Sequence, residues 1–294
     1  MKRKDFISLN DFSSLELKKI IDLAFDLKKK QKTGKGTSLL KGKTLAMLFE
    51  KPSTRTRVSF EIGMYQLGGY AVNLSPRAVQ MGEREETKDV ARTLSRYVDA
   101  IMVRTFEHAT VLELARYATV PIINGLSDLE HPCQALADVM TILEKKRKLK
   151  GLKLAYIGDG NNVCHSLMYA SEKFGMQMKI ACPTGYSPKL QTSAEVVHDP
   201  FAAVKGADVI YTDVWASMGQ EDEEKERKKI FENFQVNQTL VKAAKPDYIF
   251  MHCLPAHRGE EVSNKVIDSK NSVVFEQAEN RLHLQKAILV SLLK

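Results

Sequence analysis

Short apolar runs alternate with helix-like stretches along the whole chain. In the first half the apolar runs are residues 44–49 (TLAMLF), 70–75 (YAVNLS), 100–105 (AIMVRT) and 120–125 (VPIING). In the second half they are residues 153–159 (KLAYIGD), 178–183 (MKIACP), 209–215 (VIYTDVW), 248–255 (YIFMHCLP) and 272–278 (SVVFEQA). Such alternation is typical of parallel strands covered by helices on both faces. The pattern therefore predicts an α/β protein.

The helix-like stretches divide this pattern into two halves. A capping box at residues 13–16 precedes apolar positions at helical spacing. A long helix predicted over residues 130–150 separates the halves, and a last helix closes the chain. We therefore predict two doubly wound parallel-sheet domains joined by a helix. The first comprises residues 1–149 with the linking helix. The second comprises residues 150–294, and its C-terminal helix packs back on the first domain.

The composition fits this two-domain prediction. The chain has 294 residues, of which 44% are hydrophobic and 27% are charged, so each half has enough apolar side chains for a core. The formal net charge of +8 suits an anionic ligand and does not by itself indicate nucleic acid, because the lysines are scattered. The one dense basic cluster, residues 144–151, ends the predicted linking helix, where positive charge favours the helix dipole.

The cysteines and the N-terminus indicate the compartment. Cys133, Cys164, Cys182 and Cys253 show neither C-x-x-C spacing nor a nearby His pair, so we expect no structural zinc and no disulfide framework. Such cysteine usage favours the reduced cytosol. The first residues lack a signal-peptide pattern, and no run of about 18 apolar residues exists to span a membrane. We therefore expect a cytoplasmic protein.

The turn at Ser53, Thr54, Arg55, Thr56 and Arg57 carries the first candidate chemistry. It lies between a predicted strand and a predicted helix. The first turn of a helix offers unpaired N–H groups and the positive end of the dipole, and hydroxyls there cap the helix or bind an anion. Two guanidinium groups strengthen such a site for a doubly charged oxyanion. Phosphate binding and a plain helix cap with solvated arginines both remain open from this stretch alone.

Further polar residues follow the other predicted strands, where ligands bind in open α/β sheets. In the first half these are Arg104, Asn124 and residues 131–134 (HPCQ). In the second half they are residues 159–162 (DGNN), Asp213, Ser217, Met218 and residues 252–255 (HCLP). The first half thus supplies cations, hydroxyls and a histidine suited to an anion. The second half supplies an amide, a carboxylate and a thiol suited to a cationic or zwitterionic ligand.

Two other motifs in the second half carry weaker chemistry. Gly158 and Gly160 begin a dinucleotide-binding pattern, but Val163 replaces its third glycine and no acidic residue follows the next strand. A nicotinamide or flavin site is therefore disfavoured. The charged run at residues 220–229 is typical of a solvated helix face rather than a metal site.

Four motifs together resemble one family. They are STRTR at residue 53, HPCQALAD at 131, DVWASMGQE at 213 and HCLPAHRGEEV at 252. The first two resemble elements shared by the aspartate/ornithine carbamoyltransferase superfamily. The last two resemble signatures of its ornithine carbamoyltransferases. The resemblance runs from about Ser8 to the C-terminus.

This resemblance implies transfer of a carbamoyl group from carbamoyl phosphate to the δ-amine of L-ornithine, giving citrulline and phosphate without a metal or organic cofactor. The residues that would bind carbamoyl phosphate are Ser53, Thr54, Arg55, Thr56, Arg104, His131, Gln134, Cys253, Leu254 and Arg281. Gln80 would reach a neighbouring subunit's site, which implies a homotrimer or a multiple of trimers. The residues that would bind ornithine are Asn162, Asp213, Ser217 and Met218.

The chemistry of these side chains agrees with the implied reaction. Arg55, Arg104 and His131 are suitable donors to the oxygen of a tetrahedral intermediate. Cys253 would position ornithine or accept a proton from its amine, and both roles stay open. The alternatives are a carbamoyltransferase for putrescine or acetylated ornithine, a non-catalytic phosphometabolite-binding protein and a nucleic-acid binder. The sequence leaves the anabolic or catabolic direction and any allostery undetermined.

Overall fold

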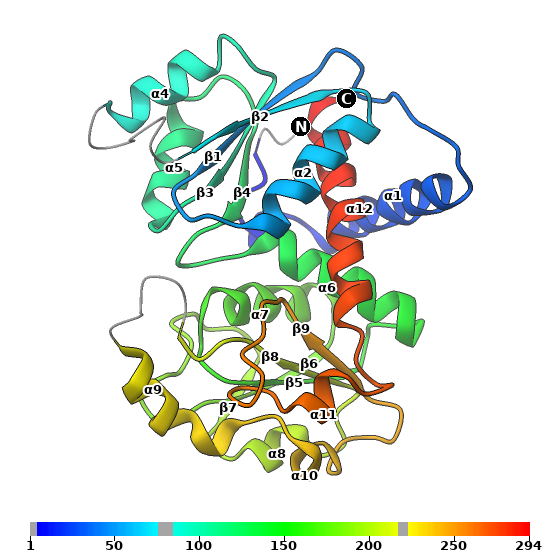
Figure 1. The fold of residues 1–294 in the computed structure, drawn as a ribbon, viewed down its shortest axis with the longest axis vertical. Helices are drawn as coiled ribbons and strands as arrows, with labels where there is room; N and C mark the ends of the chain where they lie inside the picture. Colours follow the sequence, from blue (N-terminus) through cyan, green and yellow to red (C-terminus); the bar gives the residue numbers. More distant parts are fainter. Residues whose placement is uncertain (1–4, 76–84, 217–222) are drawn as a thin grey trace. The chain divides into compact units, whose positions relative to one another are not determined.

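The computed structural model describes residues 5–75, 85–216 and 223–294, and the chain forms two compact units (Figure 1). The first unit comprises the residues up to Ala137 together with Asn280–Lys294. The second unit comprises Asp138–Glu279. Two helices, α6 (Pro132–Lys146) and α12 (Val274–Leu293), contribute residues to both units.

The first unit contains a four-stranded parallel sheet in the order β2-β1-β3-β4. Its strands are β1 (Thr44–Phe49), β2 (Tyr70–Leu74), β3 (Ala100–Arg104) and β4 (Ile122–Leu126). Its other helices are α1 (Ser14–Lys32), α2 (Thr54–Gln66), α4 (Thr87–Leu94) and α5 (His108–Tyr117). Helices α4 and α5 cover one face of the sheet, and α2 and α12 cover the other (Figure 1).

The alternation of side chains along β1 explains this layering. Ala46 and Leu48 point to one face, where they pack against Val90 of α4 and Leu114 of α5. Successive strand residues point to opposite faces, so Met47, which is also fully buried, lies under the other helices. A sheet buried on both faces needs apolar residues at nearly every position, as the continuous run over residues 44–49 has.

The second unit contains a five-stranded parallel sheet in the order β7-β6-β5-β8-β9. Its strands are β5 (Lys153–Ile157), β6 (Gln177–Ala181), β7 (Glu195–Val197), β8 (Val209–Thr212) and β9 (Ile249–His252). Its helices include α7 (Asn162–Phe174), α8 (Pro200–Val204), α9 (Glu224–Phe231), α10 (Gln238–Val241) and α11 (Asn264–Ile267). Two parallel sheets with flanking helices confirm the predicted fold class.

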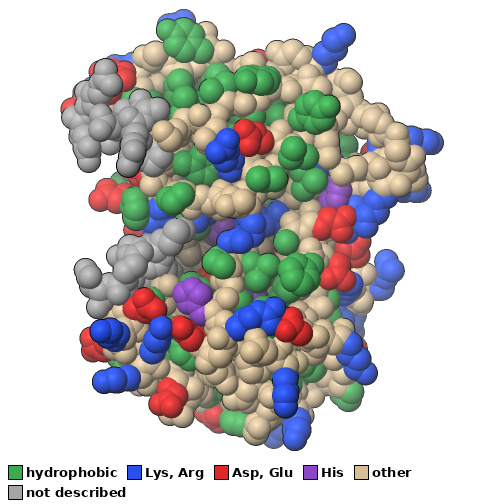
Figure 2. Space-filling view, viewed as in Figure 1, with side chains coloured by type: hydrophobic (Ala, Val, Ile, Leu, Met, Phe, Trp, Pro, Cys, Tyr) green, Lys and Arg blue, Asp and Glu red, His purple; other side chains and the backbone are tan. Residues whose placement is uncertain are grey.

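On the face that Figure 2 draws, Lys and Arg side chains are scattered over each unit and interleaved with Asp and Glu. The net charge of +8 is thus not gathered into one basic patch on that face. Within the described part of the chain, no helix combines the length and the apolar character needed to cross a bilayer.

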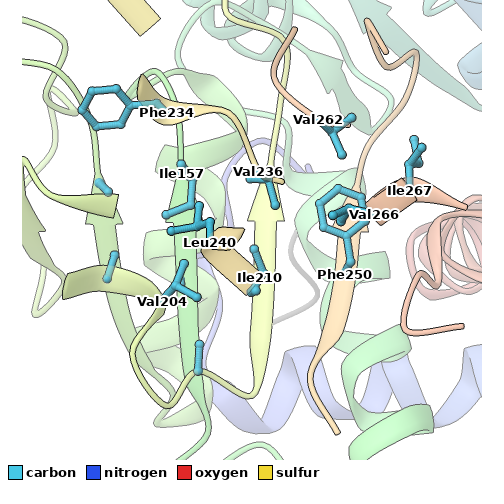
Figure 3. Packing of buried hydrophobic residues seen from close by; sticks show 14 of the residues in the cluster. Ile157, Val204, Ile210, Phe234, Val236, Leu240, Phe250, Val262, Val266 and Ile267 are labelled. Carbon is cyan, nitrogen blue, oxygen red and sulfur yellow. The ribbon is translucent and has the colours of Figure 1, made fainter. Parts of the chain in front are cut away.

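The hydrophobic core of the second unit includes the strands whose carboxyl ends carry the candidate site residues. Ile157, Ile210 and Phe250, from three neighbouring strands, pack against Val204 and Leu240 of the covering helices (Figure 3). Each such buried side chain contributes about 1.5–3 kcal/mol relative to its exposed state. The packing holds the carboxyl ends of β5, β8 and β9 rigidly, and these strand ends carry the polar residues of this unit.

The structure corrects two predictions of secondary structure in the second half. Residues 272–278 do not form a strand, because Ser272 makes only an isolated bridge to Phe250 and α12 begins at Val274. A short apolar run suits a buried strand and a buried helix equally well, and here its continuation into a long helical pattern prevails. The sequence pattern also missed β7, which is only three residues long and largely exposed.

Candidate active site

Ser53 caps the helix that follows β1, which is one of the two roles that the sequence left open for this turn. Its side chain accepts a hydrogen bond from the backbone N–H of Thr56 at 3.3 Å. Thr54, Arg55 and Thr56 are the first three residues of α2, so backbone N–H groups of this turn lack partners inside the helix. We call residues 53–56 the Ser53 turn. It presents N–H groups, hydroxyls and the positive end of the helix dipole, which together suit an oxyanion.

Arg281 adds a guanidinium to the Ser53 turn from the far end of the chain. Its Nη2 donates to Oγ1 of Thr56 at 2.9 Å, and both side chains are buried. Arg281 lies in the part of α12 that belongs to the first unit. The fold thus brings together two residues of the predicted phosphate site that lie 225 positions apart.

The two arginines of STRTR have different surroundings. Arg57 is exposed and pairs with Glu61 one turn later, at 3.2 Å. Arg55 is half-buried, and its guanidinium forms neither an ion pair nor a hydrogen bond with any residue that the structure describes. The charge of Arg55 is therefore available to a ligand, whereas that of Arg57 is already compensated on the helix surface.

Arg104, His131 and Gln134 are all buried in the first unit. Arg104 ends β3, and His131 and Gln134 lie at the start of α6. Burial, followed by the positive charges of Arg281 and Arg104, holds the pKa of His131 well below its usual range. The imidazole is therefore neutral near pH 7, so it offers a hydrogen bond without adding a third positive charge.

Cys133 has a structural environment in the first unit. Its thiol is fully buried and donates to the backbone carbonyl of Asn124 at 3.4 Å. Burial raises the pKa of the Cys133 thiol to about 12. This cysteine stays protonated near neutrality and packs as a small apolar side chain.

Glu130 precedes His131 and gives a testable dependence of stability on pH. Its side chain is 3% exposed. Burial raises the pKa of Glu130 to about 7, although hydrogen bonds from Ser8 and the Leu9 backbone oppose the shift. A carboxyl group whose pKa is raised on folding stabilises the protein fully below the unfolded-state pKa, and this contribution is lost as the pH rises to the folded-state value.

Glu130→Gln should therefore remove a loss of stability between about pH 4.5 and pH 7. The quantity to compare is the free energy of unfolding of the variant minus that of the unmutated chain. At about 1.4 kcal/mol per pKa unit, we expect this difference to be on the order of 3 kcal/mol larger at pH 8 than at pH 4.5. Urea unfolding of both proteins across this range measures the difference. Glu113→Gln, on a partly exposed position of α5, is the control and should follow the unmutated curve. If the free energy of unfolding changes with pH in the same way for Glu130→Gln and the unmutated chain, the raised pKa of Glu130 is wrong.

In the second unit, Asp213 gathers side chains from three strand ends. Its Oδ1 accepts from the Cys253 thiol at 3.0 Å and from the Val214 N–H at 2.9 Å. Its Oδ2 accepts from Nδ2 of Asn161 at 2.8 Å. Asp213 itself is 6% exposed, whereas Cys253 is half-buried. We call Asp213, Cys253 and Asn161 the Asp213 cluster. The Cys253 thiol and the Asp213 carboxylate thus pair directly.

Asn161, rather than Asn162, holds the cluster together, and the sequence analysis did not single it out. Asn161 is the N-cap of α7, and its Oδ1 accepts from the N–H groups of Val163 and Cys164. Its Oδ1 also accepts from the Tyr156 hydroxyl at 3.1 Å. An Asn directly before a helical pattern is a capping signal, so this role was readable from the sequence. Asn162 is half-buried at the first helical position.

His252 and Glu261 shape the loop that carries Cys253 and Leu254. The Leu254 N–H donates to Nδ1 of His252 at 2.8 Å, so the ring proton lies on Nε2, which donates to Glu261 at 3.2 Å. Leu254 adopts a φ of +58°, a conformation that non-glycine residues reach only when their surroundings hold them. The buried His252–Glu261 pair supplies such a hold, and Glu261 was not singled out from the sequence.

Arg227 is an exception to the solvated helix face predicted for residues 220–229, of which residues 220–222 lie outside the described residues. The other described residues from Glu223 to Lys229 are exposed or half-buried. Arg227 is 7% exposed and donates to Asp159 at 3.0 Å and to the backbone carbonyl of Trp215 at 3.0 Å. Burial raises the pKa of Asp159, and the Arg227 guanidinium opposes that shift. Arg227 also pairs with Glu223 one turn earlier on its own helix, at 2.8 Å. Its burial was missed because Asp159 and the Trp215 carbonyl lie outside that helix, where helical periodicity carries no information.

Gly160 lies where another segment of the backbone approaches closely. A Cβ at Gly160 would lie 2.2 Å from the backbone N of Pro188. The backbone near Pro188 thus occupies the position of a Cβ, and only a glycine permits this close approach.

Three of the predicted site residues, Gln80, Ser217 and Met218, lie outside the described residues. Two groupings of possible metal ligands occur among the described ones. One is His257 with Glu260 and Glu261, where Glu261 already accepts from the His252 ring. The other is Asp213 with His252 and Cys253. Both ring nitrogens of His252 already have partners, and the Cys253 thiol donates to the carboxylate. These side chains therefore satisfy one another and do not fit a metal ion.

Two family models match the chain, one on each half. The first is described as the aspartate/ornithine carbamoyltransferase carbamoyl-phosphate-binding domain and matches residues 4–144. The second is described as the Asp/Orn-binding domain of the same enzymes and matches residues 150–292. The chain belongs to the aspartate/ornithine carbamoyltransferase family, and it is an enzyme. The resemblance of the four sequence motifs is confirmed.

Within this family the chain is similar to proteins named ornithine carbamoyltransferase. It is 58% identical over 306 aligned positions to an ornithine carbamoyltransferase of Anoxybacillus flavithermus, covering 100% of this chain and 98% of that one. It is 59% identical to an anabolic ornithine carbamoyltransferase of Pyrococcus furiosus, over 97% and 95% of the two chains. A solved structure of the ornithine carbamoyltransferase from Pyrococcus furiosus superposes with a TM-score of 0.96, covering 99% of this chain and 97% of that one at 58% identity.

Proposed function

We propose that this chain transfers the carbamoyl group of carbamoyl phosphate to the δ-amine of L-ornithine, giving L-citrulline and phosphate. The observation that carries the proposal is the hydrogen bond of 3.0 Å between Cys253 and Asp213. It joins a thiol and a carboxylate at the strand ends of the Asp/Orn-binding half, and both suit an amine. The near full-length identity to ornithine carbamoyltransferases supports the choice of ornithine over aspartate.

In the first unit, the Ser53 turn holds the phosphate of carbamoyl phosphate. The hydroxyls of Ser53 and Thr56, the free N–H groups of α2 and the guanidiniums of Arg55 and Arg281 neutralise the dianion. As phosphate leaves, its growing negative charge is stabilised by the same groups. Arg104, His131 and Gln134 bind the carbamoyl end, where the neutral His131 and the cationic Arg104 stabilise the oxyanion.

In the second unit, the Asp213 cluster binds and orients ornithine. Asp213 with Asn162, and with Ser217 and Met218, binds the amino-acid end, while Cys253 and Leu254 lie beside the reacting δ-amine. The δ-ammonium loses a proton, its nitrogen attacks the carbamoyl carbon, and the C–O bond to phosphate breaks. The reaction needs no covalent enzyme intermediate, because binding both substrates on one enzyme removes most of the entropic barrier. Cys253 therefore positions the amine or accepts its proton.

The direction and the surroundings of this reaction are further parts of the proposal. A relative named as an anabolic enzyme supports a role in arginine biosynthesis. The four free cysteines agree with a cytoplasmic enzyme. Gln80 reaches the site of a neighbouring subunit, so the active form is a homotrimer or a multiple of trimers. Residues 1–149, together with Arg281 of α12, serve carbamoyl phosphate, and the rest of residues 150–294 serves ornithine.

A citrulline-forming assay with carbamoyl phosphate and a panel of amines tests the proposal. We expect turnover with L-ornithine and at least about 100-fold lower kcat/KM with putrescine, N-acetylornithine and L-aspartate, because each lacks or alters a group that the site binds. Comparable turnover with putrescine or N-acetylornithine would replace the assigned substrate. Absence of carbamoyl transfer to every amine, with phosphate release also absent, would leave a non-catalytic binding protein.

A further inference from the structure

A second basic pocket lies in the first unit, away from the Ser53 turn. It has a volume of ≈ 410 Å³ and is lined by the C-terminal ends of α1 and α2, by residues 34–38 and by Lys286 of α12. Ser53 and Gln66 mark opposite ends of α2, whose 13 residues span about 20 Å. The pocket is therefore separate from the turn that serves the proposed reaction.

Lys286 is the central group of this pocket. Its side chain is 3% exposed, and its Nζ donates to Oε1 of Gln31 at 2.5 Å and to Oε1 of Gln66 at 2.8 Å. No Asp or Glu in the described ranges pairs with it. A buried ammonium without an acidic partner is costly, and burial lowers the pKa of Lys286 to about 8. Two neutral amide oxygens hold the group in place and leave its charge uncompensated.

The other lining groups also favour negative charge. Lys30 and Lys35 line the pocket together with the hydroxyl-bearing Thr37 and Ser38. Lys30 pairs with Asp26 on the helix surface, at 2.7 Å, whereas Lys35 has no acidic partner within the described part of the chain. The described lining residues include no Asp or Glu. The pocket therefore concentrates ammonium groups and hydroxyl donors around a space large enough for a metabolite.

Two glycines, one within α2 and one just after it, allow the close approaches that form this pocket. A Cβ at Gly63 would lie 3.3 Å from Cγ of Lys286, so the glycine lets the lysine stem pass close to α2. Gly68 has a φ of +79°, and a Cβ there would lie 3.2 Å from Cβ of Ser38. Helices α2 and α12 lie side by side at this point, as Figure 1 also shows. The close approach brings Ser38 and Lys286 to one pocket.

We propose that this pocket binds a small metabolite bearing a carboxylate or phosphate oxyanion, which accepts a hydrogen bond from the Lys286 ammonium. The oxyanion supplies the negative charge that the protein does not provide at this position. The inference rests on the pocket alone and is independent of the proposed reaction.

Isothermal titration of the full-length chain with inorganic phosphate, and separately with succinate, tests the proposal. We expect Lys286→Met to weaken binding of the preferred oxyanion at this site by at least about 10-fold, because a charge-assisted hydrogen bond is lost. Lys19→Met, on an exposed position of α1, makes the same change in net charge and should leave binding unchanged. If Lys286→Met loses phosphate binding, the pocket's ligand is assigned as a phosphate ester; if it loses succinate binding, the ligand is assigned as a dicarboxylate.

Equal affinity and stoichiometry of both anions for the unmutated chain and Lys286→Met would overturn the proposal. A second measurement needs no variant. In a crystal of the unmutated protein soaked with selenate, an anomalous peak should lie within hydrogen-bond distance of Lys286 Nζ. A peak at the Ser53 turn alone would also overturn the proposal. The position of the anomalous peak thus distinguishes the two oxyanion sites.

Discussion

Arg55→Ala should lower kcat/KM for citrulline formation by about three orders of magnitude. Arg55 lies within the Ser53 turn at the second helical position of α2. It is half-buried, and its guanidinium has no partner among the residues described. Its loss removes a fixed positive charge from both the bound dianion and the departing phosphate, and single donors of this kind are worth about 10²–10³ in rate. Steady-state kinetics with varied carbamoyl phosphate measures the effect.

Arg57→Ala is the matched control for this prediction. It removes the same side chain two positions later on the same helix, where the guanidinium is exposed and paired with Glu61 at 3.2 Å. Exposed pairs of this type contribute about 0–1 kcal/mol to stability, so turnover should change by less than about threefold. If Arg55→Ala folds normally and keeps the unmutated kcat/KM, the assignment of phosphate to the Ser53 turn is wrong.

Asp213→Asn should lower kcat by about 100-fold or more. It should raise KM for ornithine more than KM for carbamoyl phosphate. The two carboxylate oxygens accept from the Cys253 thiol, the Val214 N–H and the Asn161 amide. An asparagine has one acceptor oxygen, so its NH₂ group must face at least one of these donors. The Cys253 thiol and the bound amine lose their orientation, and proton transfer of this kind is worth about 10²–10⁴ in rate.

Asp208→Asn is the control for Asp213→Asn. Asp208 is similarly buried at the opposite end of β8, where it accepts from the Lys153 N–H at 2.9 Å and pairs with Lys245 at 2.6 Å. The Lys153 N–H and the Lys245 ammonium help to hold the pKa of Asp208 below its usual range, against the effect of burial, so its loss should cost stability and spare turnover. Unchanged kcat in Asp213→Asn, or an equal fall in Asp208→Asn, would show that the carboxylate acts only structurally.

The pH profile of turnover depends on the same cluster. An alkyl amine titrates near ~10.4 and a free thiol near ~8.5, so more of the attacking species forms as the pH rises. Because His131 stays neutral above its depressed pKa, it should add no inflection between pH 6 and 8. The unmutated enzyme should therefore become faster toward alkaline pH, and Asp213→Asn should shift or flatten that rise.

Much of the secondary structure was predictable because strand and helix periodicity are local properties. The apolar run at residues 44–49 reads as a doubly buried strand, and the structure has β1 there. The capping box at Ser13 and Glu16 is present with both hydrogen bonds. The run at residues 272–278 failed because its length and composition suit either element, and packing of the long α12 decided between them.

The sequence by itself determined the α/β class, the kinds of side chain at each strand end and the family. Tertiary structure alone decided which of these side chains meet: Arg281 with Thr56 across 225 positions, and Cys253 with Asp213 across 40. It also buried Arg227, whose charged helical neighbours suggest an exposed position, and it placed the Lys286 ammonium between Gln31 and Gln66. The reason is that periodicity records which face of an element is apolar, whereas contacts and burial depend on which distant element covers that face.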